Sequence, residues 1–564
     1  MTRRRRDFAW TGWTFAAVIV AWMSNVASRQ IRTTWAATHD MARAGESVST
    51  AWRHPAPSFN RTDLLAAGAA IVILLLIWVY QYGGRKQTRP GEEQGSAAWA
   101  KPSDMIPYSN KNKGENLLMT KTEALNLDTH ATRRNLNVLV TGASGAGKTR
   151  GYVLPNLTNL ARHHTPISLC VTDPKGEIFT ATAAPMRQAG WRVKTFNLID
   201  MASSDHFNPL RYVNPDDPEG SIIRLADNIL SNTTKENRNG SNGDFWDKAA
   251  KSLLTALIAF TWFVEEEKDR NLNTVIHMLL DMQASENDEN AMSPTDVLFH
   301  DASQKVEDYH LFPDQYDQAT GAALDGLAFA CSQYRTYEQG AGETKKSIIT
   351  TLSNNLAGLM THRIQEILSD DTMHLEAVGE QPTIIYIIIS DTNATFTYLA
   401  ALFYQCLFET TIYQADHTPG GALDVPLHCM LDEFANIGRI PGFPTLISTM
   451  RSRGISVSII LQTIAQIKSL YKDNWETITA NCDSKLFLGG NDLATTEWWS
   501  KMLGNQTIYI TSTSQNNGSN GNWGRQQNSQ KRELLAPDEL GRLPNDQCIY
   551  LLRGLRPFLS QKLR

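Results

Sequence analysis

The sequence has few cysteines, no excess of positive charge and almost no low-complexity sequence. Its 564 residues include six scattered cysteines, none in a C-x-x-C pair, and the formal net charge is −5. This spacing argues against a disulfide scaffold or a zinc site and favours reduced thiols in a cytosolic domain. The acidic balance gives no chain-wide signature of nucleic-acid binding, so any DNA contact requires local basic surface. With 42% hydrophobic and 20% charged residues, the composition indicates a folded chain of two or three domains.

Two long uncharged runs near the N-terminus depart from this ordinary composition. They occupy residues 8–28 and 64–84, with tryptophan or tyrosine near their ends. Each run would reach about 31 Å as a helix, enough to cross a hydrocarbon core of roughly 30 Å. The first run contains Thr, Ser and Asn and is also compatible with a signal peptide. We predict two transmembrane helices.

Basic residues flank the two runs on the same predicted side. Arginines at 3–6 precede the first run, and Arg85, Lys86 and Arg89 follow the second. The positive-inside rule places both of these ends in the cytoplasm. The sequence therefore predicts a membrane anchor at 1–95, with a short extracytoplasmic loop at 29–63, a linker at 85–95 and everything beyond it cytoplasmic.

Short apolar runs recur through the rest of the chain and predict the strands of a sheet. Continuous β-branched runs separated by helices are typical of parallel strands that are buried on both faces. Between 196 and 383 the pattern is helical instead. We expect an α/β nucleotide-type domain interrupted by a mostly helical insert at 215–375. The strand candidates lie at 137–140, 167–171, 193–196, 383–389, 426–431, 456–461, 485–489 and 548–552.

One polar, glycine-rich stretch lies at 514–530 and reads SQNNGSNGNWGRQQNSQ. Such a composition is typical of a flexible chain. We predict a surface loop between two strands.

The stretch TGASGAGKTR at 141–150 follows a predicted strand and precedes a predicted helix. Its form, G-x-x-x-x-G-K-T, lets backbone N–H groups surround a phosphate at the positive end of a helix. Lys148 would reach the β- and γ-phosphates, and the Thr149 hydroxyl would bind Mg²⁺. A turn without a ligand is the alternative, which this context disfavours. The predicted nucleotide contacts are Gly142, Gly145, Ala146, Gly147, Lys148 and Thr149.

An acidic pair follows the apolar run at 426–431. Asp432 would hold the Mg²⁺ shell, and Glu433 would polarise the attacking water. An apolar run that ends in Asp-Glu is common by chance, and it gains weight here from the glycine loop in the same predicted sheet. Together they predict an ATPase.

Polar residues at the two ends of the run at 456–461 are further candidates. Arg451 and Arg453 precede it, and an arginine here would neutralise γ-phosphate charge in a neighbouring subunit. The alternative for them is solvated surface charge. Gln462 follows the run and would sense the γ-phosphate, or else cap the strand.

Asp173 ends the predicted strand at 167–171, in the sequence DPKGE. If this strand lies beside the glycine loop, Asp173 and Lys175 line the nucleotide crevice, because ligands gather at the carboxyl ends of parallel strands. A plain turn is the alternative, since Pro-Lys-Gly is good turn chemistry.

Nine segments occur in one order and together resemble the coupling-protein ATPases of type IV secretion, the TraG/TraD class of conjugative elements. The likeness begins near residue 96 and runs almost to the end. The glycine loop keeps the phosphate-binding positions but lacks the proline and second Thr-Gly pair of many members. The segments are GASGAGKT, VTDPKGE, FNPL, FW, LDEFANIGRIPGF, RSRGIS, LQTIAQ, NCDSKLFLGG and LLAPDEL.

The resemblance implies a RecA-like P-loop NTPase domain at 96–214 and 376–564, with an inserted all-α domain. It implies a hexameric motor at the inner membrane that uses ATP and Mg²⁺. The motor would recruit single-stranded DNA bound to a relaxase and deliver it to the secretion channel and its ATPases. Carried over by position, Lys148 and Thr149 match the phosphate-loop pair, and Asp432 and Glu433 match the acidic pair. Arg451 matches the interprotomer arginine, and Gln462 matches the glutamine that follows.

Other functions remain open at this point. Within the same class, the cargo would be a protein effector instead of DNA. A pump for double-stranded DNA in chromosome segregation usually has more membrane spans and a separate C-terminal domain that reads DNA. A membrane receptor with nucleotide only as a structural ligand would not need Glu433 or Arg451.

Overall fold

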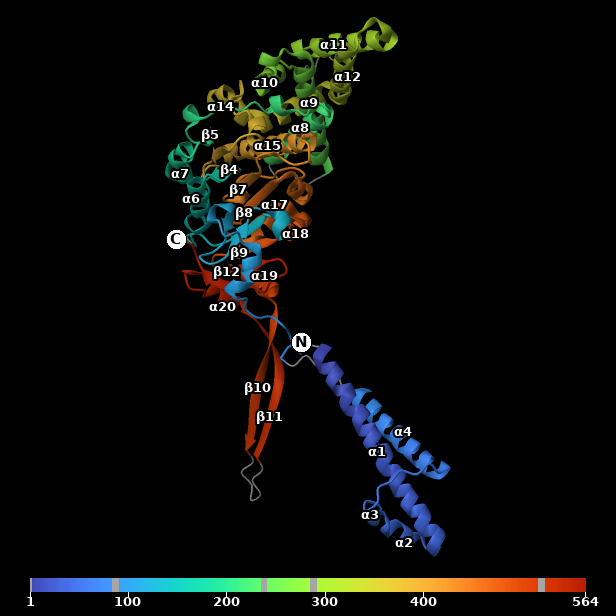
Figure 1. Cartoon of the computed structure of the whole chain (residues 1–564). Helices are drawn as coiled ribbons and strands as arrows, with labels where there is room; N and C mark the ends of the chain where they lie inside the picture. The colour runs from blue at the N-terminus through green and yellow to red at the C-terminus, as the bar shows by residue number, and fades with distance from the viewer. Residues whose placement is uncertain (1–2, 84–90, 235–240, 285–291, 516–522, 564) are drawn as a thin grey trace. The chain divides into compact units, whose positions relative to one another are not determined.

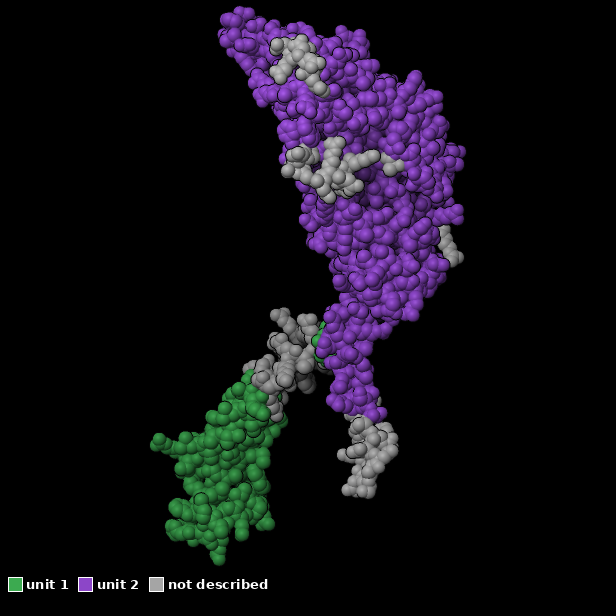
Figure 2. Space-filling view, turned by 180° about the vertical axis from the view of Figure 1, so that it is seen from behind, with its two compact units in different colours: residues 1–93 green, residues 94–564 purple. Residues whose placement is uncertain are grey.

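The computed structural model describes residues 3–83, 91–234, 241–284, 292–515 and 523–563. The chain divides into two units, 1–93 and 94–564, which Figure 2 colours separately. The first unit consists of α1 (Arg3–Thr38), α2 (Met41–Glu46), α3 (Val48–Ala51) and α4 (Arg61–Gly83).

One helix among the described residues is long and apolar enough to cross a membrane, Arg61–Tyr80 within α4. The first predicted span lies within α1, where Ser, Thr and Asn interrupt the apolar sequence. Two of these polar side chains bond toward α4: Ser24 Oγ donates to the carbonyl of Ala66 at 3.1 Å, and Ser28 Oγ donates to Asp63 at 2.8 Å. Of the two predicted spans, one is therefore a candidate by length and composition.

The second unit is built on a nine-stranded sheet (Figure 1). The strands from β9 to β5 are parallel, as predicted, while β12 and β13 at one edge are antiparallel. The sequence pattern does not distinguish β12 from the parallel strands, because β12 is mostly buried as they are. The order is β13 (Phe558–Gln561), β12 (Gln547–Leu552), β9 (Ser484–Phe487), β3 (Val138–Thr141), β8 (Ile455–Leu461), β7 (Leu427–Leu431), β4 (Ser168–Asp173), β6 (Thr383–Ile388) and β5 (Arg192–Asn197).

Alternate residues of the central strands belong to two separate apolar cores, one on each face of the sheet. In β3, Val138 and Val140 pack with α6 and α7, whereas Leu139 packs in the core that includes α15 and α17. Both faces are covered, which is why the central strands are apolar throughout. The helices around the sheet are α5 (Thr129–Thr132), α6 (Leu154–His163), α7 (Glu177–Gln188), α15 (Thr397–His417), α16 (Phe443–Thr449), α17 (Ile464–Tyr471), α18 (Trp475–Ala480), α19 (Leu493–Leu503) and α20 (Pro537–Gly541).

Between β5 and β6, the described residues form seven α-helices. The buried helix α9 contacts α8, α10, α12 and α13 and forms the centre of this group. The group joins the core on the α15 face of the sheet. Its members are α8 (Pro218–Thr233), α9 (Ser241–Val264), α10 (Leu272–Leu280), α11 (Pro294–Leu311), α12 (Gln318–Glu338), α13 (Gly342–Leu356) and α14 (His362–Ile367).

A long two-stranded ribbon, β10 (Asn505–Gln515) and β11 (Trp523–Glu533), projects from the second unit (Figure 1). The prediction of a loop at 514–530 was wrong for 514–515 and 523–530, which are paired strand; residues 516–522 lie outside the described part. Polar sequence is compatible with a strand here because neither face of the ribbon needs an apolar core.

The base of this ribbon holds the segment that follows the linker. The Ala97 N–H donates to the Asn505 carbonyl at 2.8 Å, and Thr507 Oγ1 donates to the Gly95 carbonyl at 3.0 Å. A Cβ on Gly95 would collide with the Asn505 backbone, so glycine permits this close approach. A further short ribbon pairs β1 (Asn116–Leu118) with β2 (Ala124–Asn126).

Candidate functional site

The glycine loop connects β3 to the helix behind it and is fixed by both neighbouring strands. The Gly142 N–H donates to Leu461 at the end of β8 at 3.1 Å, and the Ala143 N–H donates to Gly489 after β9 at 2.9 Å. Gly145 and Gly147 have φ of 79° and 87°, a region that side chains with a Cβ rarely adopt. The loop therefore keeps a turned-in backbone, the form that binds anions.

The chain enters its helix through a π-helical turn, Thr149–Val153, before α6 continues. The Gly151 N–H donates to the Gly147 carbonyl at 2.6 Å, so the helical bonding begins inside the loop. Single π-turns often occur at functional sites, and the positive end of a helix favours a bound anion.

Lys148 is nearly buried and lies over the loop. Its ammonium donates to the Gly142 carbonyl at 3.1 Å and lies 3.4 Å from Oε1 of Glu433. A buried charge needs such partners. Lys148 and Glu433 are 285 positions apart in the chain, and their side chains lie close together, as the sequence predicts.

Asp432 follows the last residue of β7 and is 2% exposed. Thr149 Oγ1 donates to its Oδ2 at 2.9 Å. Burial raises the pKa of Asp432 to about 6, and the bond from Thr149 opposes that shift. The structure brings together the two residues that were predicted to share a metal ion.

We expect Asp432→Asn to stabilise the protein when nucleotide and Mg²⁺ are absent. Because the pKa of Asp432 is higher in the folded chain than its ordinary value of 3.8, folding takes up a proton between those values. Its contribution to the free energy of unfolding therefore falls as the pH rises from about 4 to about 6, by up to about 3 kcal/mol.

Melting temperatures of the two proteins at pH 4 to 8 check this expectation. The stabilisation by Asn should appear above pH 6 and shrink toward pH 4, and the exposed Asp473→Asn serves as a control. A stability difference that does not change with pH would contradict it.

Glu433 occupies an unusual backbone conformation for a residue with a side chain, with φ of 50°. Gln462, directly after β8, donates its Nε2 to both carboxylate oxygens of Glu433 at 3.0 Å. Positive φ in a non-glycine residue costs free energy and is found disproportionately at functional sites. The glutamine and Lys148 thus fix the direction in which this carboxylate points.

Arg451 lies at the other end of β8 from Gln462, and its side chain is exposed. Its Nη2 donates to the Thr129 carbonyl at 3.0 Å. The seven residues of β8 span roughly 23 Å, so Arg451 is remote from the glycine loop of its own chain. Arg453 differs, because its guanidinium is held by Asp416 through two bonds at 2.7 and 2.9 Å.

Asp173 is not brought to the glycine loop. Strands β8 and β7 lie between β3 and β4, a separation of about 14 Å. Its carboxylate accepts bonds from the N–H groups of Gly176 at 2.9 Å and Phe179 at 2.8 Å, at the start of α7. Burial raises the pKa of Asp173, and these bonds oppose the shift. These contacts fit the alternative of a plain turn. The prediction that Asp173 lines the nucleotide crevice was wrong, because the local sequence does not encode the order of the strands in the sheet.

Two residues that carry no recognisable pattern contact the loop or the end of the strand that leads into it. Trp499 Nε1 in α19 donates to Thr141 Oγ1, the last residue of β3, at 2.8 Å. Lys562 Nζ donates to the carbonyl of Ala146 at 2.9 Å. They lie 358 and 416 positions from their partners, so no sequence spacing signals these contacts.

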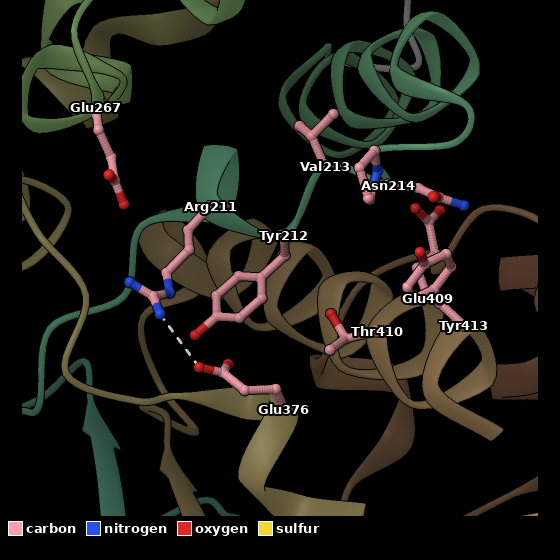
Figure 3. Close-up of a pocket in the computed structure, with 10 residues that line it drawn as sticks. Arg211, Tyr212, Val213, Asn214, Glu267, Glu376, Glu409, Thr410 and Tyr413 are labelled. Carbon is pink, nitrogen blue, oxygen red and sulfur yellow. Dashed lines mark hydrogen bonds and ion pairs between the residues drawn. The ribbon is translucent and has the colours of Figure 1, made fainter. Parts of the chain in front are cut away.

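A cavity of about 350 Å³ lies elsewhere, beside α15 (Figure 3). Arg211 and Glu376, which line this cavity, form an ion pair at 3.2 Å. No residue of the glycine loop is among the lining residues. The candidate site is therefore identified by converging side chains and not by this hollow. The lining residues are Arg211, Tyr212, Val213, Asn214, Pro215, Glu267, Glu376, Glu409, Thr410 and Tyr413.

The curated proteins to which this chain is similar include VirD4 and TraG proteins. Protein VirD4 of Agrobacterium fabrum is 22% identical over 527 residues, which cover 91% of this chain and 70% of that protein. Conjugal transfer protein TraG of Escherichia coli is 23% identical over 429 residues, which cover 72% of this chain and 62% of that protein.

Solved structures of the coupling protein TrwB share the fold. The unbound bacterial conjugative coupling protein TrwBdeltaN70 aligns with a TM-score of 0.58 at 14% identity, covering 85% of this chain and 96% of that one. The plasmid coupling protein TrwB in complex with ADP and Mg²⁺ aligns with a TM-score of 0.52 at 13% identity, covering 83% and 92%. The predicted α/β fold with a mostly parallel sheet is thereby confirmed.

A model of the family described as type IV secretory system conjugative DNA transfer matches residues 98–564. Because this match covers most of the sequence, the chain belongs to that family.

Proposed function

We propose that this chain is the membrane-anchored, ATP-driven coupling protein of a type IV secretion or conjugation system. The observation that carries the proposal is the convergence of Lys148, Thr149, Asp432, Glu433 and Gln462 around one glycine loop in a chain of this family. The description of its family, conjugative DNA transfer, supports DNA as the cargo.

The residues at the loop fit a nucleotide with Mg²⁺. A hydroxyl and a buried carboxylate, from Thr149 and Asp432, are oxygen donors of the kind that Mg²⁺ takes alongside phosphate oxygens. Within the described ranges, no group of three or more His, Cys, Asp or Glu side chains forms a metal site. That absence suits an ion held mainly through its nucleotide, and the TrwB complex with ADP and Mg²⁺ supports the assignment.

Each residue then has a separate task in hydrolysis. Bound MgATP supplies the phosphoryl group. The N–H groups of the loop and the Lys148 ammonium bind the phosphates. Asp432 and Thr149 would hold the metal, and a carboxylate oxygen of Glu433 would accept the proton of the attacking water. Gln462 keeps that carboxylate oriented through its two bonds at 3.0 Å.

Arg451 completes the site of a neighbouring subunit in a homo-hexamer. Two observations support this role: its exposed position and its distance from the loop of its own chain. A guanidinium that reaches the γ-phosphate from the next subunit would couple hydrolysis to assembly.

We expect the full-length protein in lipid nanodiscs to hydrolyse ATP faster with single-stranded DNA, at a rate that rises steeply with protein concentration. Arg451→Ala should lower this rate at least about tenfold. Mixing equal amounts of Arg451→Ala with a Glu433→Gln chain should restore about a quarter of the sites, because one chain supplies an intact loop and the other an intact arginine. Hydrolysis is followed by phosphate release.

Arg453→Ala serves as the control, since that guanidinium is already occupied by Asp416. A mixture that stays as inactive as its two components would contradict action between subunits. A hydrolysis rate that changes with neither single-stranded DNA nor protein concentration would contradict the proposed function.

The N-terminal unit would anchor this motor with two spans, α1 and α4. The Arg32 guanidinium pairs with the buried Asp63 carboxylate at 2.9 Å, so polar groups of the two helices satisfy each other. Basic residues at 3–6 and 85–89 favour a cytoplasmic N-terminus and a cytoplasmic motor. The motor domain would comprise 96–214 and 376–564, with the all-α domain at 215–375 and the anchor at 1–95.

The partners that follow are a relaxase with its bound single strand, the secretion channel and its ATPases. Export of protein effectors is the alternative cargo. A substrate receptor with nucleotide only as a structural ligand is the alternative mechanism, and the Glu433→Gln variant separates it from a motor.

A further inference from the structure

The end of the described chain lies against the glycine loop. After β13, the Lys562 N–H donates to the Asp546 carbonyl at 2.8 Å, which fixes the backbone, and its ammonium donates to the Ala146 carbonyl at 2.9 Å. The next carbonyl, of Leu563, lies 3.5 Å from the point where a Cβ on Gly151 would be. The segment therefore touches both the loop and the first helical turn behind it.

The carbonyl that Lys562 holds belongs to the peptide unit that joins Ala146 to Gly147. In a trans peptide the C=O and the N–H point in opposite directions. A cation that binds this carbonyl therefore aims the Gly147 N–H away from Lys562. An anion-binding loop needs its N–H groups, and not its carbonyls, directed at the ligand.

Glycine makes this orientation easy to lose. Gly147 has φ of 87°, and a Cβ placed there would meet no atom within 4 Å, so no side-chain packing restrains the peptide plane. The Gly142 and Ala143 bonds fix the first half of the loop, and the bonds from the Ala146 N–H to Ala143 at 3.0 Å and from Gly151 to the Gly147 carbonyl at 2.6 Å use the peptide units on either side of the one that joins Ala146 to Gly147. Lys562 supplies a restraint on its second half.

The ammonium is available for this task. Among the described residues, no carboxylate lies within the 4.0 Å of an ion pair with Lys562, and its side chain is partly buried. Burial lowers the pKa of Lys562, an effect that the nearby Asp546 opposes. A hydrogen bond from a charged group is worth more than one between neutral groups.

We propose that Lys562 is a positioning residue of the phosphate-binding loop: it holds the Ala146 carbonyl outward so that the Gly147 N–H faces the β-phosphate. The inference rests on the proposed function, because it assumes that the loop binds a nucleoside di- or triphosphate. It adds the C-terminal segment to the nucleotide site.

The test is direct titration of ATP and ADP into full-length protein in nanodiscs. Lys562→Met should weaken the affinity for both nucleotides about tenfold. The loss should be equal, since both ligands carry a β-phosphate. The rate at saturating ATP should stay within about twofold, because the contact serves bound nucleotide and transition state alike.

Lys121→Met is the matched control. Its ammonium donates to Gln561 Oε1 at 3.2 Å, one position away in the same segment, but contacts no loop atom in the described structure. Affinity lost equally in Lys121→Met would indicate a general role of this segment in stability and would overturn the proposal. Lys562→Arg, which keeps a charged donor, should retain most of the affinity, whereas Lys562→Gln should not.

Unchanged affinity in Lys562→Met would overturn the proposal, as would a lower saturated rate with unchanged affinity. If that variant fails to fold, the comparison of Lys562→Arg with Lys562→Gln decides, and equal affinities in those two would overturn it. A wild-type protein that binds neither nucleotide would instead refute the proposed function, so the two failures are distinguishable.

Discussion

Glu433→Gln should leave ATP bound and slow its hydrolysis about a thousandfold. The amide keeps the size of the side chain but cannot accept the proton of the attacking water. Lys148 loses its ion pair at 3.4 Å and becomes freer to hold phosphate, so affinity for ATP should be equal or higher. Binding is measured by titration, hydrolysis by phosphate release, and transfer by counting recipient cells that acquire the mobile DNA.

Transfer should be lost together with hydrolysis. Glu476→Gln, on the exposed surface of α18, is the control and should change neither. If Glu433→Gln blocks hydrolysis while transfer continues, the nucleotide is a structural ligand and the chain is a substrate receptor instead of a motor.

Lys148→Met should weaken binding of ATP about a thousandfold and abolish transfer. The substitution removes a buried ammonium that faces the phosphates and leaves Glu433 with Gln462 as its remaining described partner. The lost contact with the phosphates and the unpaired negative charge of Glu433 both lower the affinity for ATP.

Lys175→Met distinguishes the glycine loop from the turn that follows β4. Lys175 is exposed and pairs with Asp391 at 3.5 Å, so its loss should change ATP affinity less than twofold, within the range of a surface ion pair. If cells with correctly inserted Lys148→Met protein transferred DNA as often as the wild type, the motor proposal would be wrong.

Local pattern predicted the strands and the residues that meet at the glycine loop, because each pattern depends on neighbours in the chain. The strand at 456–461 and the loop at 142–149 are short patterns whose meaning is fixed by period and by glycine conformation. The acidic pair could be matched to the loop because both follow strands of one parallel sheet, and the carboxyl ends of such strands share an edge.

What sequence did not predict depends on contacts across the fold. The order of strands puts β8 and β7 between Asp173 and the loop, and nothing near Asp173 encodes that order. Lys562 and Trp499 reach the loop from the end of the chain. The loop predicted at 514–530 was misjudged because its polar sequence gives no apolar alternation, although backbone pairing extends β10 and β11 into it.

Residues 95–97 are hydrogen-bonded to the base of β10, so a pull on the preceding chain would act first on this ribbon. Tension on the linker would pull on the Asn505 carbonyl and on Thr507, directly after α19 ends at Leu503. From α19, the Trp499 indole would pass such a displacement to Thr141, one residue before the glycine loop. Within the second unit, residues 95–97 and the strand that leads into the phosphate-binding loop are thus linked through the base of β10, α19 and one indole hydrogen bond.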